Sequence, residues 1–345
     1  MNKNLERVTS KAMLEDLLST PSKEVVKLFT EIEGDIMFLG VSGKIGPSLA
    51  RMAVRACQEA GVTKRIYGAS IFASDQERLQ IEQMGVETFH GNLLDSEFIQ
   101  SLPKAAHVYF LAGMKFGSEE NLSLTWAVNS FLPALVADYY KGSSIVAFST
   151  GCVYPLVPVD SGGSLETDMP QPVGEYAQSC LGRERMFEYG SLQHKTRVCL
   201  IRLNYAVELR YGVLVDIAVK VKNRQEIDLS MGHFNVIWQG DVNEMVLRSV
   251  ANCESPAKIL NITGPETLSV REVALEFAKH FQVEATFIEK EAGTALLNNA
   301  SLAFQLFGRP KTAPRQIIQW IAHWIEDGMD LLGKPTHYEV RDGKY

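Results

Sequence analysis

Short apolar runs alternate along the chain with longer stretches of helical periodicity. The runs are rich in branched and aromatic residues and end in polar or glycine-containing turns, and they cover residues 35–39, 65–69, 87–89, 107–111, 144–148 and 197–201. Apolar runs of this length between helices are typical of parallel strands whose sheet is covered by helices on both faces. The pattern therefore predicts an α/β fold with a parallel sheet.

The first run ends in a glycine-rich turn, Gly40-Val41-Ser42-Gly43-Lys44-Ile45-Gly46, and a helical stretch follows over residues 47–60. Glycines at such a turn let the backbone bend sharply and approach a pyrophosphate, and the helix N-terminus offers its amides and the positive end of its dipole. Taken alone, the turn also fits a strand-to-helix connection without a ligand. The ends of the other strands must therefore be considered with it.

Residues with useful chemistry follow several of the later runs. Ala112-Gly113-Met114-Lys115 comes after the run that ends at Leu111, and Ser149-Thr150-Gly151-Cys152 follows the run 144–148. Tyr176 and the segment Arg202-Leu203-Asn204-Tyr205 come later. Ligands of open parallel sheets bind beyond the carboxyl ends of the strands, so we expect these residues around one crevice.

In this order, the motifs resemble those of the extended short-chain dehydrogenase/reductase superfamily, in particular its NAD-dependent epimerase/dehydratase family, over about residues 35–330. The resemblance implies a Rossmann-type doubly wound sheet, a smaller α+β C-terminal lobe for the substrate, and NAD or NADP as cofactor. It also implies an oxidoreductase, epimerase or dehydratase that acts on a carbohydrate or a related hydroxy compound. Tyr176 would be the acid or base, and Thr150 would orient the substrate oxygen.

The same resemblance implies which residues contact each ligand. The expected cofactor contacts are Gly40, Ser42, Gly43, Lys44, Ile45, Gly46, Ser70, Asn92, Leu93, Leu111, Ala112, Gly113, Lys115, Asn129, Tyr176 and Cys180. The expected substrate contacts are Thr150, Cys152, Arg202, Asn204 and Phe234. No metal site is expected, because the cysteines are scattered without zinc-like spacing.

These assignments divide the chain into three parts. Residues 1–34 form a helical N-terminal extension, with one helix over 11–18 and a second that has Thr20 as N-cap and Pro21 at its first position. Residues 35–205 form the core of the dinucleotide-binding domain. Residues 206–345 form mainly the substrate lobe, and some of its segments are candidates to return to the sheet. The resemblance also implies a homodimer that pairs helices within 121–140 and 176–189.

One position departs from the family pattern. A lysine normally stands four residues after the tyrosine, where its charge lowers the tyrosine pKa, but this chain has Cys180 there. A neutral thiol cannot supply that charge, and Arg183 and Lys115 are the candidate replacements. Cys180 fits a small packing residue better than a nucleophile, because no histidine is placed to activate it. Two hypotheses stay open: an enzyme with a compensated active site, or a dinucleotide-binding sensor or scaffold protein.

The sequence leaves open whether the cofactor is NAD or NADP and which compound is the substrate. Ser70 lies where an acidic residue would favour NAD, and a serine accepts either a ribose hydroxyl or a ribose phosphate. Phe234 stands where the family often has an arginine that contacts a diphosphate, so a smaller carbohydrate or a hydroxy-acid derivative is favoured over a sugar nucleotide. Arg202, Asn204 and Arg210 are candidates to bind an anionic group.

The amino-acid composition limits the kinds of partner that the protein can bind. The chain has 345 residues, 46% hydrophobic and 22% charged, with a formal net charge of −7. This balance predicts a soluble protein without the basic surface that nucleic acids or anionic membranes require, so we expect only a small-molecule, sugar-like substrate besides the second subunit. Five scattered cysteines and the lack of a long apolar run favour the reducing cytoplasm.

Overall fold

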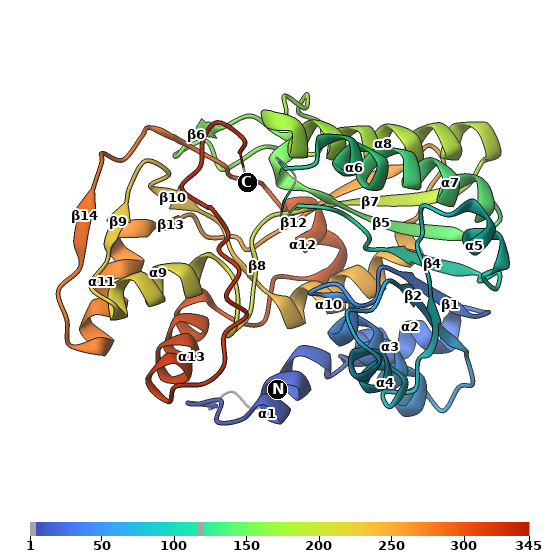
Figure 1. Cartoon of the computed structure of the whole chain (residues 1–345), viewed down its shortest axis with the longest axis horizontal. Helices are drawn as coiled ribbons and strands as arrows, with labels where there is room; N and C mark the ends of the chain where they lie inside the picture. The colour runs from blue at the N-terminus through green and yellow to red at the C-terminus, as the bar shows by residue number, and fades with distance from the viewer. Residues whose placement is uncertain (1–4, 116, 118–119, 345) are drawn as a thin grey trace.

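A computed structural model of the protein describes residues 5–115, 117 and 120–344. In this part of the chain a seven-stranded parallel sheet forms the centre of the molecule, in the order β12-β7-β5-β4-β1-β2-β3 (Figure 1). Its strands are β1 (Ile36–Leu39), β2 (Ile66–Ser70), β3 (Glu87–His90), β4 (His107–Phe110), β5 (Ser144–Thr150), β7 (Arg197–Leu203) and β12 (Lys258–Ile262). Because the chain moves outward from β1 in both directions, the predicted doubly wound α/β fold is confirmed.

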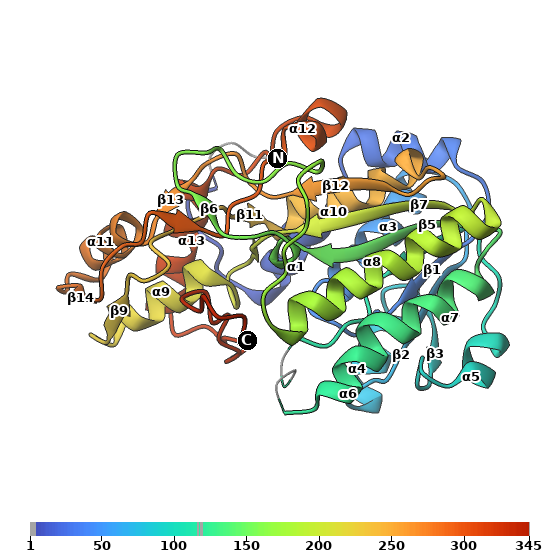
Figure 2. The ribbon, with the colours of Figure 1, turned by 90° about the horizontal axis from the view of Figure 1, so that it is seen from above.

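Helices cover both faces of the sheet, as Figures 1 and 2 show. The helices α2 (Lys23–Glu31), α3 (Gly46–Ala60), α4 (Asp75–Glu82), α10 (Gln239–Arg248) and α12 (Ser301–Phe307) pack on one face, and α5 (Ser96–Ser101), α7 (Leu132–Tyr139) and α8 (Gly174–His194) on the other. Phe38 and Val146 point into the first layer, and their neighbours Leu39 and Ala147 point into the second. Since every second side chain enters a different core, the strands read as continuous apolar runs.

A smaller lobe lies beyond the carboxyl ends of these strands. It comprises β6 (Val157–Pro158), β8 (Ala206–Val207), α9 (Val213–Lys222), β9 (Glu226–Asp228), β10 (His233–Phe234), β11 (Ile237–Trp238), β13 (Leu268–Ser269), α11 (Val270–Phe281), β14 (Thr286–Ile288), β15 (Thr294–Ala295) and α13 (Pro314–Glu326). Its helices bury their apolar sides in a core of its own. Strand β12 leaves this lobe and pairs in parallel with β7 in the large sheet.

The N-terminal extension forms two helices, and one predicted boundary needs correction. Helix α1 (Lys11–Ser19) ends at Thr20, whose hydroxyl donates to the Asp16 carbonyl at 2.7 Å instead of capping a new helix. The cap of α2 is Ser22, whose hydroxyl accepts from the Val25 amide at 3.3 Å. Thr20 was therefore wrong as the N-cap, and Pro21 lies in the connection between the helices.

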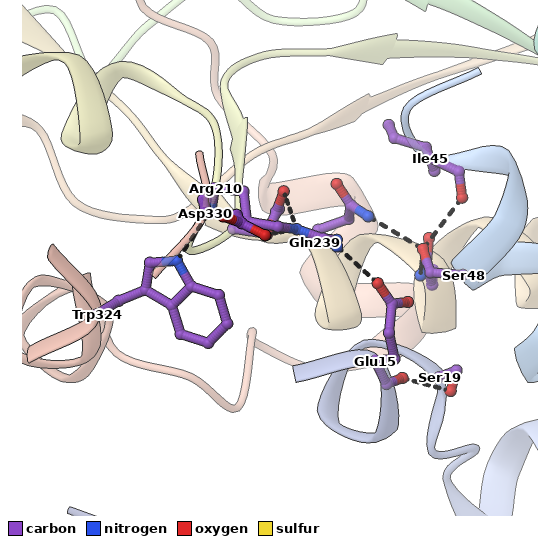
Figure 3. Close-up of polar contacts among 10 residues, drawn as sticks. Glu15, Ser19, Ile45, Ser48, Arg210, Gln239, Trp324 and Asp330 are labelled. Carbon is purple, nitrogen blue, oxygen red and sulfur yellow. Dashed lines mark hydrogen bonds and ion pairs between the residues drawn. The ribbon is translucent and has the colours of Figure 1, made fainter. Parts of the chain in front are cut away.

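Helix α1 contacts both parts of the molecule. Its Asp16 pairs with Arg55 of α3 at 2.9 Å, and its Glu15 pairs with Arg210 of the smaller lobe at 2.7 Å. Figure 3 shows Arg210 facing Glu15. The extension therefore bridges the sheet domain and the smaller lobe.

After α13 the chain runs back across the smaller lobe toward the start of α8, and Figure 1 shows this segment in red. The Thr336 amide donates to Asp216 of α9 at 2.7 Å, and the Arg341 guanidinium donates to the Thr294 carbonyl at 2.8 Å. These contacts hold residues 331–344, the C-terminal segment, over the crevice between the two parts. None of the helices in the described residues is long and apolar enough to cross a membrane.

Candidate functional site

The turn after β1 has a backbone that only glycine accommodates at two positions. Gly40 has a φ of 88°, and a Cβ there would lie 2.7 Å from the Ala112 amide at the end of β4. A Cβ at Gly46 would overlap the Val41 carbonyl oxygen. Helix α3 starts at Gly46 without a side-chain cap. Because the Gly46 amide donates to the Gly43 carbonyl at 3.1 Å and Pro47 has no amide hydrogen, the helix offers an anion mainly the positive end of its dipole.

A first cavity opens on one side of this turn. It is lined by Gly40, Ser42, Gly43, Ser70, Ile71, Asn92, Leu93, Leu94, Leu111, Ala112, Gly113, Val128 and Leu132. Many of the residues expected to contact the cofactor thus come together here. The Ser42 and Ser70 hydroxyls are 2.6 Å apart and join the turn to the end of β2. Backbone amides, small side chains and hydroxyl groups in this arrangement fit one half of a dinucleotide.

A second cavity lies on the other side of the turn. Its lining is Lys44, Ile45, Lys115, Ser149, Thr150, Cys152, Tyr176, Leu203, Asn204, Tyr205, Ala206, Tyr211, Gly212 and Thr336. Among these residues are Thr150, at the end of β5, and Tyr176, in the first turn of α8, and the Thr150 side chain is close enough to lower the pKa of Tyr176. The structure thus joins the two hydroxyl groups that the sequence separates by a long loop.

The environment of Tyr176 keeps its hydroxyl protonated. Burial raises the pKa of Tyr176 well above its ordinary value, and the Cys180 and Cys152 thiols raise this pKa further. The Arg183 guanidinium and the Thr150 side chain act in the opposite direction. At neutral pH the Tyr176 hydroxyl is therefore a proton donor.

Cys180 and Arg183 occupy different places around that tyrosine. Burial raises the pKa of Cys180 to about 11, so its thiol is neutral and packs beside Val153 and Tyr154. Arg183 reaches into the interior, where it donates to the Phe148 carbonyl at 2.8 Å. Its charge lowers the pKa of Cys180 as well as that of Tyr176. Of the candidate replacement cations, Arg183 thus lowers the pKa of Tyr176 by its charge, and Lys115 lines the same cavity as Tyr176.

Asn129 holds the loop after β4 in place. Its side-chain amide accepts from the Met114 amide and donates to the Met114 carbonyl, both at 2.9 Å, and it also accepts from Arg183 at 2.6 Å. It is fully buried. Asn129 thus fixes the loop whose residues Gly113 and Lys115 line the first and the second cavity, respectively.

Two predicted substrate contacts need correction. Arg202 is 1% exposed and forms two hydrogen bonds to the Glu184 carboxylate, at 2.9 and 2.7 Å, so its charge is already paired inside the protein. Phe234 is buried in the core of the smaller lobe beside the ring of Tyr205. Neither side chain lines the second cavity, whereas Asn204, Thr150 and Cys152 do.

Arg210 is also engaged within the protein. Besides Glu15, its guanidinium contacts the Glu208 carboxylate at 3.1 and 3.2 Å.

In Figure 3, Gln239 reaches Ser48, whose hydroxyl in turn contacts the Ile45 carbonyl beside the glycine turn. The start of α10 is thereby joined to the start of α3.

Several lining residues were missed from the sequence. Thr336 accepts a hydrogen bond from Lys115 at 3.2 Å through its carbonyl, although 221 positions separate the two residues. Tyr211 lies in the loop before α9, and its ring faces the Lys44 ammonium at 3.5 Å. No local pattern marks such contacts, because only the fold brings these segments together. Over the described ranges, no group of three or more His, Cys, Asp or Glu side chains is placed to hold a metal ion.

Of the comparisons with known proteins, the one with solved structures identifies the fold of this chain. No protein-family model and no curated protein sequence matches the chain. Among solved structures, UDP-glucose 4-epimerase from Thermus thermophilus, in complex with NAD, aligns with a TM-score of 0.69 at 20% identity, over 84% of this chain and 99% of that one. The chain has the fold of this enzyme.

Two further structures share the fold. A mutant UDP-glucuronic acid 4-epimerase from Bacillus cereus, in complex with NAD and a fluorinated UDP-sugar acid, has a TM-score of 0.70 at 15% identity over 85% of this chain and 99% of that one. The dTDP-glucose 4,6-dehydratase DesIV from Streptomyces venezuelae, with NAD bound, has the same TM-score and identity over 85% and 97%.

Proposed function

We propose that the protein is an NAD-dependent oxidoreductase of the epimerase/dehydratase kind, acting on a sugar-like hydroxy compound. The observation that carries this proposal is that Tyr176 and Thr150 line one cavity, which lies across the glycine turn from the first cavity. The structures that share the fold support it, because they are sugar-nucleotide epimerases and a dehydratase with NAD bound.

The bound nicotinamide would accept or return a hydride at the substrate carbon. Tyr176 would hold or move the proton at the substrate oxygen, and Thr150 would orient that oxygen through its hydroxyl. A protonated Tyr176 suits the step in which the substrate oxygen receives a proton. The positive charge of Arg183 would favour the reverse step, in which Tyr176 accepts that proton, and would thus replace the lysine absent at position 180.

We further propose NAD rather than NADP as the cofactor. Of the described residues that line the first cavity, none is Lys or Arg, so an additional ribose phosphate would find no cationic partner there. Ser42 and Ser70 instead offer hydroxyl groups to an unmodified ribose. Calorimetric titration with NAD and NADP checks this preference, and equal affinities would contradict it.

The central test is the exchange Tyr176→Phe. With a panel of sugars and hydroxy acids, product analysis and nicotinamide absorbance first identify a substrate of the wild-type protein. The variant should then lose about 10²- to 10⁴-fold in kcat, the range typical of a general acid or base, while its NAD affinity stays the same. Tyr189→Phe, an exchange at an exposed position of the same helix, is the matched control. Unchanged turnover in Tyr176→Phe would exclude this role.

The second candidate is a dinucleotide-binding sensor or scaffold. The raised pKa of Tyr176 and the cysteine at position 180 favour it, because both weaken the usual proton transfer. It predicts NAD binding without conversion of any compound in the panel. Turnover by the wild-type protein excludes it.

A homodimer in the cytoplasm completes the proposal. Large apolar side chains are exposed on neighbouring helices, α6 (Leu122–Trp126), the π-helical turn Ala127–Phe131 and α8, and they include Trp126, Phe131, Tyr189 and Leu192. An apolar surface of this kind fits a second copy of the chain. All five cysteines are free thiols, which fits a reducing compartment.

A further inference from the structure

The glycine turn divides its side chains between the two cavities. Ser42 and Gly43 line the first cavity, whereas the next two residues, Lys44 and Ile45, line the second. The Lys44 ammonium donates to the Ala206 carbonyl at 3.2 Å and lies 3.5 Å from the centre of the Tyr211 ring. A turn that serves the dinucleotide thus also places a positive charge on the side of the reacting hydroxyls.

A second ammonium group lines the same cavity. Lys115 comes from the loop after β4 and donates to the Thr336 carbonyl of the C-terminal segment. The two lysines are close enough that the charge of Lys115 lowers the pKa of Lys44. None of the residues that the structure places in this lining is Asp or Glu, so the two ammonium groups are its charged side chains.

The carboxylates nearest to Lys44 are engaged elsewhere. Glu208 pairs with Arg210, and Asp216 accepts from the amide and the hydroxyl of Thr336 at 2.7 and 2.5 Å. In the described part of the chain, the Lys44 ammonium contacts a carbonyl and an aromatic ring instead of a carboxylate. Partly burying a cation without a counter-ion is costly, and a bound anion in the cavity would offset this cost.

We propose that the second cavity binds a carboxylate of the substrate, with Lys44 as the specificity-determining residue and Lys115 beside it. The inference rests on the proposed function and narrows its substrate to a sugar acid or a related hydroxy acid. The carboxylate would lie between the two ammonium groups, and a hydroxyl of the same molecule would face Tyr176 and Thr150. Neither lysine enters the chemical step.

The test compares acids with their neutral partners on the NAD-loaded protein. Glucuronate is paired with glucose, galacturonate with galactose, and gluconate with glucitol, and binding is followed by calorimetry. At least one acid should bind about tenfold or more tightly than its partner, as expected for a charge-assisted contact. Lys44→Met should remove most of this preference, and Lys44→Arg should keep part of it. The exposed Lys27→Met on α2 is the matched control.

Each other outcome overturns the inference. Equal binding of acids and neutral partners would contradict it. A preference for acids that survives in Lys44→Met would contradict it as well. If Lys44→Met weakened NAD binding instead, the ammonium would serve the cofactor pyrophosphate. Failure of the wild-type protein to bind NAD would refute the proposed function, and the same comparison without NAD would still decide whether the lysines bind a carboxylate.

Discussion

Lys44 shows how strongly position changes the chemistry of a single side chain. Burial lowers the pKa of Lys44 to about 7, although the charge of Glu208 opposes this shift. The other charged groups that act on it are Lys115 and Arg210, which lower the pKa, and Asp216, which raises it. The ammonium therefore titrates near neutral pH, where a surface lysine would stay charged.

This shift predicts a pH-dependent cost of folding. Below pH 7 the folded protein buries a charged Lys44, whereas from about pH 7 to about pH 10 the unfolded chain binds the additional proton, so stability rises with pH in that window. Lys44→Met should therefore raise the free energy of unfolding by about 2–4 kcal/mol near pH 6, and the gain should shrink toward pH 10. Urea unfolding at several pH values measures it. A gain independent of pH would contradict the assignment.

Gly46 makes a second prediction at this scale. Because a methyl group there would overlap the Val41 carbonyl, Gly46→Ala should lower the free energy of unfolding by about 1–3 kcal/mol and weaken NAD binding. Gly142→Ala is the control, since a Cβ at that position meets no atom within 4 Å. Urea unfolding and NAD titration of both variants provide the comparison. Equal effects of the two exchanges would show that the close approach at Gly46 is unimportant.

At the scale of elements, α8 is joined to β7 by a buried ion pair below the second cavity. Glu184 of α8 holds Arg202 of β7 through two hydrogen bonds and also accepts from the Ser149 hydroxyl at 2.5 Å. The Tyr154 hydroxyl accepts from Arg202 at 2.6 Å. The pair thus fixes the helix that carries Tyr176 relative to the strand end that carries Thr150.

Removing one charge of this pair should be costly. Glu184→Gln leaves the Arg202 guanidinium buried without its counter-ion, and we expect a loss of about 3–5 kcal/mol in the free energy of unfolding. Glu188→Gln, on the same helix, breaks only the partly exposed pair with Arg185 and should cost less than about 1 kcal/mol. Chemical denaturation of both variants tests the difference. A small effect of Glu184→Gln would mean that the pair is dispensable.

The elements differ in how well the sequence predicts them. Strands with two buried faces produce continuous apolar runs, so those from β1 to β7 in the large sheet could be located to within a few residues. Strand β12 was assigned mainly to the substrate lobe, because its pairing with β7 forms only after the chain has passed through that lobe. For the same reason Arg202 was taken for a substrate contact: its partner Glu184 lies on a different element. Thr336 was missed because nothing local marks its contact with Lys115.

At the scale of the whole molecule, the apolar surface on α6 and α8 predicts the oligomeric state. Replacing Tyr189 and Leu192 together by Asp should convert a dimer into monomers, because two charges would have to be buried in the interface. Leu275→Asp, at an exposed position on α11, should leave the dimer intact. Light scattering coupled to size-exclusion chromatography measures the mass. A monomeric wild-type protein would contradict the proposed dimer.

Helix α1 limits how far the two parts of the molecule can move apart. Its neighbouring residues Glu15 and Asp16 hold Arg210 of the smaller lobe and Arg55 of the sheet domain, respectively, so a wide hinge motion would have to break at least one of these ion pairs. We therefore expect a crevice of nearly constant width, with local shifts of the C-terminal segment admitting small molecules. The radius of gyration in solution scattering should then be the same with and without NAD.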